Sequence, residues 1–125
     1  ISTNNNLKIV TDQIGCPTSV NSLAIICWKL IEKCSLTDNY PSIFHWRNSG
    51  VISWYDFADA IIEIAYRYKI ISKKARIIPI STAEYPCPAI RPKYSVLDTS
   101  STIEFLNTEN KYWRTELEKI IKSYS

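Results

Sequence analysis

The sequence contains no methionine, only two glycines and a single histidine among its 125 residues. The missing methionine predicts a piece of a longer chain, because a complete translated protein begins with that residue unless it is processed. The sequence also has no glycine-rich dinucleotide loop, no P-loop and no G-x-S-x-G nucleophile turn. A Tyr-x-x-x-Lys pair is absent as well. We therefore expect neither catalytic nor cofactor-binding residues in this chain.

Long apolar runs and strong charge are also lacking. No run approaches the roughly 20 residues that cross a bilayer, and the first residues lack the basic and apolar parts of a signal peptide. The net charge is only +3, and no Lys or Arg cluster exceeds two or three residues. We expect a cytoplasmic protein that binds no membrane and no nucleic acid. An anionic small molecule stays open as a ligand.

The cysteines do not form a metal or disulfide pattern. No two of them have C-x-x-C spacing, and His45 is the only histidine that could join them. A disulfide framework would also need a secreted protein. We expect no metal site, and thiols buried as small apolar side chains, at Cys16, Cys27, Cys34 and Cys87. Cys16 and Cys87 lie in turn-rich segments, so these two could be more accessible. His45 stands in an apolar run, which favours a structural role over a catalytic one.

The residues that are present suit one globular domain over residues 1–125, since 46% are hydrophobic and 22% charged. Short apolar runs predict strands at residues 7–10, 43–46 and 77–80, the last at a sheet edge because Pro79 cannot donate to a ladder. Such short strands are expected to flank or extend a sheet formed elsewhere in a longer chain.

Two amphipathic helices are predicted between these strands, and a short helix and a third amphipathic helix are predicted after the last strand. Thr18 or Ser19 is expected to cap the first, whose apolar stripe comprises Val20, Leu23, Ala24, Cys27, Leu30, Ile31 and Cys34. The S-x-x-D pattern of Ser53 and Asp56 is typical of a capping box and starts the second, which ends near residue 68. Asp98 or Thr99 caps the short helix, and the last begins near residue 113. The apolar faces of these strands and helices are larger than the area that they can bury against one another. We therefore expect exposed apolar surface.

Two polar segments are candidates for binding. In "TDQIGCPTS", residues 11–19, Gly15 fixes a turn before a helix start, where backbone N–H groups and Thr18 could hold an anion or a carbonyl. The Gln13 amide has a donor and an acceptor that complement the N–H and C=O edge of a pyrimidine base. The alternative is a plain turn with a helix cap.

The second segment is "EYPCPAIRPKYSVLD", which we call the strap (residues 84–98). Its three prolines favour a rigid, extended backbone. A guanidinium held in place there can grip a phosphate with two parallel hydrogen bonds, so Arg91 is a candidate phosphate ligand; the alternative is a solvated arginine. Tyr85 or Trp54 could cover the face of a sugar or base, although an aromatic residue placed like Trp54 is more often part of a core.

Three segments together resemble a known family. "IVTDQIGCPTS", "IFHWRNSGVISWYDFADAI" and "PISTAEYPCPAIRPKYSVLDTS" are similar, in order and spacing, to the C-terminal half of dTDP-4-dehydrorhamnose reductases, which are extended short-chain dehydrogenases/reductases. The likeness runs from Leu7 to about Trp113. Family members often have Ala-Arg-Arg-Pro where this chain has Ala-Ile-Arg-Pro at residues 89–92, so one basic residue is missing.

The resemblance implies a mixed α/β fold that forms the substrate-binding part of such a reductase, without the Rossmann core. The longer parent would reduce dTDP-4-dehydro-L-rhamnose to dTDP-L-rhamnose with NADPH or NADH, bound by an N-terminal Rossmann domain that acts as partner to this chain. Its implied substrate-binding residues are Gln13, Gly15, Thr18, Tyr85 and Arg91. Mg²⁺ and a homodimer are left open, and this chain alone is expected to be inactive.

Two other interpretations assign the protein a binding role without catalysis. The regulatory β subunit of methionine adenosyltransferase resembles these reductases, so a non-catalytic regulator of the same fold is one alternative. A free-standing binding domain is the other, and it would need a start codon just before residue 1. The sequence upstream of residue 1 discriminates among the three interpretations.

Overall fold

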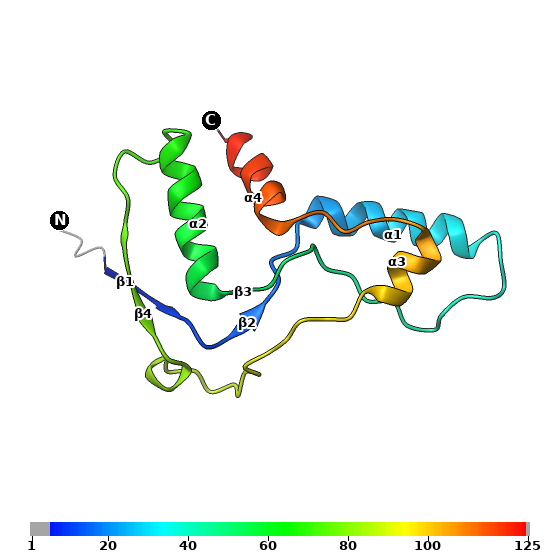
Figure 1. Ribbon diagram of the computed structural model, residues 1–125, viewed down its shortest axis with the longest axis horizontal. Coiled ribbons are helices and arrows are strands. Elements are labelled where there is room, and N and C mark those ends of the chain that lie inside the picture. The colour runs from blue at the N-terminus through cyan, green and yellow to red at the C-terminus, as the bar shows by residue number, and fades with distance from the viewer. Residues whose placement is uncertain (1–5, 125) are drawn as a thin grey trace.

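The computed structural model describes residues 6–124, which form a mixed α and β structure, as predicted. Figure 1 shows the elements in chain order. They are β1 (Asn6–Val10), β2 (Ile14–Gly15), α1 (Val20–Cys34), β3 (Ile52–Ser53), α2 (Trp54–Arg67), β4 (Arg76–Ile80), the 3₁₀ helix η1 (Thr82–Glu84), α3 (Ser100–Leu106) and α4 (Trp113–Lys122). None of the helices within residues 6–124 is both long and apolar enough to cross a membrane.

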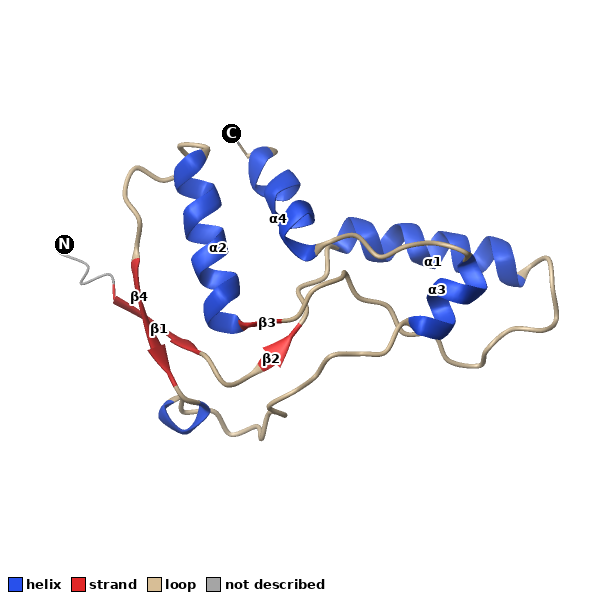
Figure 2. Ribbon diagram, in the orientation of Figure 1, coloured by secondary structure: helices blue, strands red, loops and turns tan. Residues whose placement is uncertain are grey.

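The strands form two small sheets. β1 and β4 pair in parallel, with Leu7 opposite Ile77 and Val10 opposite Ile80, and β2 pairs antiparallel with β3. Figure 2 shows both pairs on the same side of the molecule as α2, whereas α1 and α3 extend away from them. Parallel strands need a crossover connection, and here α1 and α2 both lie within it.

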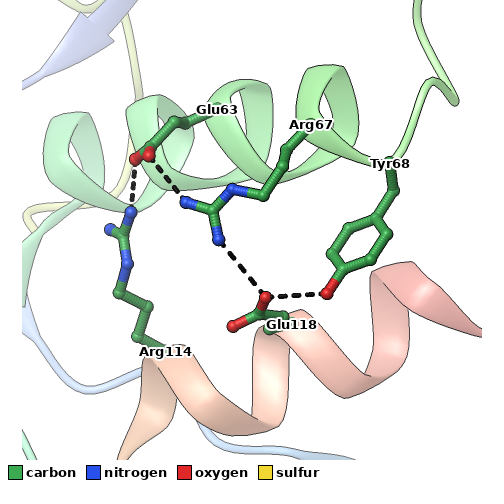
Figure 3. Close-up of polar contacts among 5 residues, drawn as sticks. All are labelled: Glu63, Arg67, Tyr68, Arg114 and Glu118. Atoms are coloured by element: carbon green, nitrogen blue, oxygen red, sulfur yellow. Dashed lines mark hydrogen bonds and ion pairs between the residues drawn. The ribbon is translucent and has the colours of Figure 1, made fainter.

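The core surrounds α2, which lies between the β1–β4 pair and α4. Ile64 and Ala65 of α2 are buried against Ile121 of α4. On the opposite side of α2, the last residues of the parallel strands, Val10 of β1 and Ile80 of β4, are buried. Ionic contacts add to the packing of α2 against α4, as Figure 3 shows. This arrangement holds the ends of β1 and β4 close to the first turn of α2.

The helix starts follow the predicted caps. Ser19 caps α1 by accepting from the backbone N–H of Ser22, and Ser53 and Asp56 form both bonds of the capping box of α2. The Asp98 carboxylate accepts from the backbone N–H of Ser100 at 2.9 Å, which satisfies one donor at the start of α3. The residues around each cap therefore determine where these helices begin.

The prediction of a strand at residues 43–46 is wrong, because this segment is a loop with no strand beside it among residues 6–124. Its Phe44 ring instead packs on Phe105 of α3, with ring centroids 5.3 Å apart. No pattern in the sequence indicates β3, which is only two residues long. It pairs with β2, which lies within the turn predicted at residues 11–19.

The prediction of buried cysteines is wrong for Cys27, whereas Cys16 and Cys87 are accessible, as their turn-rich segments indicated. Cys27 and Cys87 are exposed, Cys16 and Cys34 are partly exposed, and all four are free thiols. Cys27 lies on the predicted stripe of α1, most of which faces solvent, since α1 buries only Ser22 and Ile26. The predicted stripe is therefore not the buried face of α1 among residues 6–124, since neither Ser22 nor Ile26 belongs to it. The expected exposed apolar surface is therefore present, and α1 carries much of it.

Candidate functional site

Two adjoining cavities lie where β1, β2, the start of α2 and the strap meet. The first has a volume of about 430 Å³ and the second about 350 Å³. Gln13, Trp54 and Arg91 line both cavities, so the two form one groove. Gly15 and Thr18 line the first, and Tyr85 lines the second. The structure thus brings all five predicted site residues to one groove, while their roles stay predictions.

The turn after β1 holds Gln13 at the centre of this groove. The Thr11 backbone N–H donates to the carbonyl of Ile80 at 3.0 Å, which extends the β1–β4 pairing past β1. Gln13 is only 8% exposed, and its Nε2 donates to the Thr82 hydroxyl at 3.1 Å. That hydroxyl donates in turn to Asp12 Oδ1 at 2.7 Å. The groove wall therefore includes a series of hydrogen bonds that joins the turn after β1 to η1.

The loop from Gly15 to Ser19 is fixed by Asn48, which is completely buried. Asn48 Oδ1 accepts from the Ser19 backbone N–H at 2.8 Å, and the Asn48 carbonyl accepts from the Cys16 thiol at 2.8 Å. The Thr18 hydroxyl donates to the Cys16 carbonyl and accepts from the Asn48 N–H. Because its hydrogen is used within the loop, the Thr18 hydroxyl offers a ligand no free donor here.

The strap is extended and mostly exposed, and two backbone hydrogen bonds fasten it to β2. Ile14 N donates to Lys93 O at 2.8 Å, and Ser95 N donates to Ile14 O at 2.9 Å. These bonds hold Pro92 and Ser95 in the wall of the first cavity. Arg91 stands just before this anchored stretch, so its backbone is held at the groove. The stiffness expected from the prolines is therefore reinforced by pairing with β2.

Arg91 has no carboxylate partner among residues 6–124. Its guanidinium contributes to a lowered pKa of the exposed Cys87 thiol, for which the backbone N–H of Ala89 is the larger cause. A guanidinium that lines two cavities without a counter-ion is suited to an anionic ligand.

Aromatic side chains line the groove beside the polar ones. Trp54 is 56% exposed and Tyr85 50% exposed. The expectation that Trp54 belongs to the core is therefore wrong: as the first residue of α2 it faces both cavities, and its ring meets Phe57 edge-on with centroids 6.4 Å apart. Phe57 in turn packs on the buried Trp113. Flat aromatic faces of this kind can cover a base or a sugar ring.

The groove residues do not form a metal centre. Within the described part of the chain, no three His, Cys, Asp or Glu side chains gather closely enough to hold a metal ion. Asp12 is held by hydrogen bonds from Thr82, and these lower the pKa of its carboxyl. Burial raises the pKa of the Cys16 thiol. His45 lies on the exposed loop and lines neither cavity.

Sequence reasoning missed several groove residues. Phe57 and Ser53 were assigned only to a helix, and Ser95 only to the strap, yet all three line the first cavity. Asp12 and Thr82 stand next to recognised motifs, but they meet across 70 residues of chain. Only Asp12 had a signal in the sequence, because it adjoins Gln13 in the D-Q-x-G-x-P-T pattern.

A family model described as the RmlD substrate binding domain matches residues 1–125. Among curated proteins, the spore coat polysaccharide biosynthesis protein SpsK of Bacillus subtilis is 35% identical over 123 residues, which are 98% of this chain and 39% of that protein. A dTDP-4-dehydrorhamnose reductase of Aggregatibacter actinomycetemcomitans is 32% identical over 95% of this chain and 40% of its own length. The chain thus spans about two fifths of these relatives.

Solved structures of dTDP-4-dehydrorhamnose reductases also match most of this chain. A dTDP-4-dehydrorhamnose reductase from Clostridium acetobutylicum matches 96% of this chain and 39% of its own, with a TM-score of 0.78 and 34% identity. The Bacillus anthracis reductase, solved in complex with NADP, matches 96% of this chain and 38% of its own, with a TM-score of 0.74 and 30% identity. The fold described above is therefore that of one part of such structures.

Proposed function

This chain belongs to the RmlD substrate binding domain family, and from that premise we propose that it forms the nucleotide-sugar-binding part of a dTDP-4-dehydrorhamnose reductase. The observation that carries the proposal is Arg91, which lines both cavities of the groove and has no carboxylate partner within residues 6–124. A diphosphate is the part of a dTDP-sugar that such a guanidinium binds best, because its oxygens accept two parallel hydrogen bonds.

In this proposal the groove binds the dTDP-sugar along its length. Arg91 neutralises the diphosphate, and the rings of Trp54 and Tyr85 cover the flat faces of base and sugar. Apolar walls exclude water, which strengthens the polar contacts with the ligand. The anchored strap sets the position of Arg91 before the ligand arrives, so little freedom is lost on binding.

The reaction proposed for the whole enzyme is reduction of dTDP-4-dehydro-L-rhamnose to dTDP-L-rhamnose. NADPH or NADH supplies the hydride when bound, and this sequence has no glycine-rich loop to hold it. We assign the cofactor and the proton-donating tyrosine to a Rossmann domain beyond these residues. The residues described here bind and orient the substrate. A cytoplasmic location and a homodimer belong to the same proposal.

Replacement of Arg91 tests the proposal in the full-length parent protein. Loss of a charge-assisted hydrogen-bonding group costs about 1.5 to 3 kcal/mol. Arg91→Ala should therefore weaken dTDP binding roughly ten- to hundred-fold, measured by calorimetric titration. Arg91→Lys should recover only part of the affinity, because an ammonium lacks the two-pronged geometry of a guanidinium.

Arg76→Ala is the matched control, since Arg76 is exposed at the start of β4 and lines neither cavity. It should leave dTDP affinity unchanged, and cofactor affinity should stay constant in all variants. Equal dTDP affinity in wild type, Arg91→Ala and Arg91→Lys, with folding intact, would refute the role of Arg91.

A further inference from the structure

Gln13 combines deep burial with an unused hydrogen-bond acceptor. The side chain is only 8% exposed and lines both cavities. Its Nε2 donates to Thr82, whereas its Oε1 accepts no hydrogen bond from residues 6–124. Among residues 6–124, three side-chain polar atoms are both inaccessible to solvent and without a hydrogen-bond partner, and Gln13 Oε1 is not one of them. A buried amide usually satisfies both its atoms, so the oxygen facing the groove is available to a ligand.

The direction of the hydrogen bonds around Thr82 follows from chemistry. Asp12 Oδ1 lies 2.8 Å from the Thr82 backbone nitrogen and 2.7 Å from its hydroxyl oxygen. An ionised carboxylate only accepts, so the hydroxyl must donate its single hydrogen to Asp12. The hydroxyl oxygen can then only accept from Gln13, which requires the NH₂ group of the amide. The carboxylate thereby determines which end of the Gln13 amide faces Thr82 and which faces the groove.

The charge on Asp12 is maintained by the same contacts. Hydrogen bonds from the Thr82 side chain and backbone, with a smaller contribution from the charge of Lys93, lower the pKa of the Asp12 carboxyl. Asp12 is therefore ionised at neutral pH, and the order of donors and acceptors is fixed.

We propose that Asp12 and Thr82 are positioning residues that hold the Gln13 carbonyl oxygen toward the groove, where it accepts a hydrogen bond from an N–H or O–H of the ligand. The identity of that ligand as a dTDP-sugar rests on the proposed function above. Two of its groups have this chemistry: the imide N–H of the thymine base and a hydroxyl of the sugar. The second N–H of Gln13 is free to donate to a carbonyl beside the imide.

Thr82→Val in the full-length parent tests the arrangement. Valine has nearly the same shape and keeps the backbone N–H that bonds to Asp12, but it removes the hydroxyl that orients Gln13. Loss of this preorganised acceptor should weaken ligand binding about ten-fold, measured by calorimetry. Thr82→Ser restores the hydroxyl and should restore affinity. Thr115→Val, on the exposed side of α4, is the control and should bind like wild type.

Two ligands distinguish the two donors. If the imide N–H is the donor, Thr82→Val weakens dTDP and dTDP-L-rhamnose equally. If a sugar hydroxyl is the donor, only dTDP-L-rhamnose is weakened. Should Thr82→Val fail to fold, Asp12→Asn is the second variant: its amide permits the reversed hydroxyl, so a smaller loss of affinity is expected. Wild-type affinity for both ligands in these variants, while Arg91→Ala still weakens binding, would overturn the inference and leave the proposed function standing.

A measurement without ligand separates the inference from the proposed function. In nitrogen-15 spectra, the Gln13 side-chain N–H bonded to Thr82 should exchange with water more slowly than its twin. Thr82→Val should abolish that difference, and Thr82→Ser should keep it. If wild type binds no dTDP, the proposed function fails, and these spectra still decide the positioning. An exchange difference that persists in Thr82→Val would refute it.

Discussion

At the scale of single residues, Asn48 organises the loop that borders the groove. Its amide bonds to three groups in two segments: the Ser19 N–H and the Ser22 hydroxyl at the start of α1, and the Lys111 carbonyl before α4. The sequence predicts a turn at residues 48–50, but in the structure Ser49 forms an isolated β-bridge with Tyr112, and Gly50 next to it has a positive φ of 94°. It does not predict the burial of Asn48, because the partners of this side chain lie 26 to 63 residues away.

Asn48→Ala should destabilise the protein strongly. The change leaves the Ser19 N–H without its partner, and an unsatisfied buried group costs about 1–3 kcal/mol. It also removes the two hydrogen bonds that the Asn48 amide donates to the Ser22 hydroxyl and the Lys111 carbonyl, although that carbonyl keeps the Ser49 N–H as a donor. We expect a loss of about 2–4 kcal/mol in the free energy of unfolding, measured by urea denaturation. Asn39→Ala, in the exposed loop after α1, should change it by no more than about 0.5 kcal/mol. Similar stabilities for the two variants would contradict this role of Asn48.

At the scale of elements, α2 and α4 are joined by a network of charged groups that Figure 3 shows in full. Glu63 pairs with Arg67 on its own helix at 2.9 Å and with Arg114 of α4. Arg67 also reaches Glu118 at 3.3 Å, and the Tyr68 hydroxyl donates to Glu118 at 2.9 Å. The network spans the edge of the core where Ile64 and Ile121 meet.

The network should make stability depend on acid pH. Arg114 and then Arg67 hold the pKa of Glu63 below its ordinary value of 4.5. The contribution of Glu63 is therefore complete above that value and is lost as pH falls through the lowered pKa of the folded state. Glu63→Gln should remove this part of the dependence, so the thermal unfolding of wild type and variant should differ most above pH 4.5 and converge as the pH falls through the lowered pKa. A difference independent of pH would exclude the ionic explanation.

The helices and the strands differ in how far sequence predicts them. Helix starts such as Ser53 were predictable because the cap and its partner Asp56 are three residues apart. The strand prediction at residues 43–46 was wrong because apolar residues alone do not specify a neighbouring strand to pair with. Phe44 packs instead on a ring in α3. The groove was partly predictable, since Gln13 and Arg91 lie in recognisable motifs, whereas Asp12 and Thr82 meet only through the β1–β4 pairing.

At the scale of the whole molecule, the proposed function predicts how the 125-residue chain and its full-length parent differ in activity. The sequence has neither a glycine-rich cofactor loop nor a Tyr-x-x-x-Lys pair. The 125-residue chain alone should therefore oxidise no NADPH or NADH in the presence of dTDP-4-dehydro-L-rhamnose, measured by the loss of nicotinamide absorbance. The full-length parent, assayed alongside, should oxidise it. Turnover by the purified 125-residue chain that depends on the 4-keto sugar would contradict this prediction.

The parallel pairing of β1 with β4 also has a consequence for synthesis of the chain on the ribosome. Asn6 pairs with Arg76, and the Asp12–Thr82 bond beside the groove spans 70 residues. At roughly 5–20 residues per second, β1 emerges several seconds before its partner exists. During that interval α1 and α2 can form locally, whereas the Gln13 wall cannot. The groove is therefore among the last features to be completed during translation, and an interrupted synthesis would yield helices without a binding site.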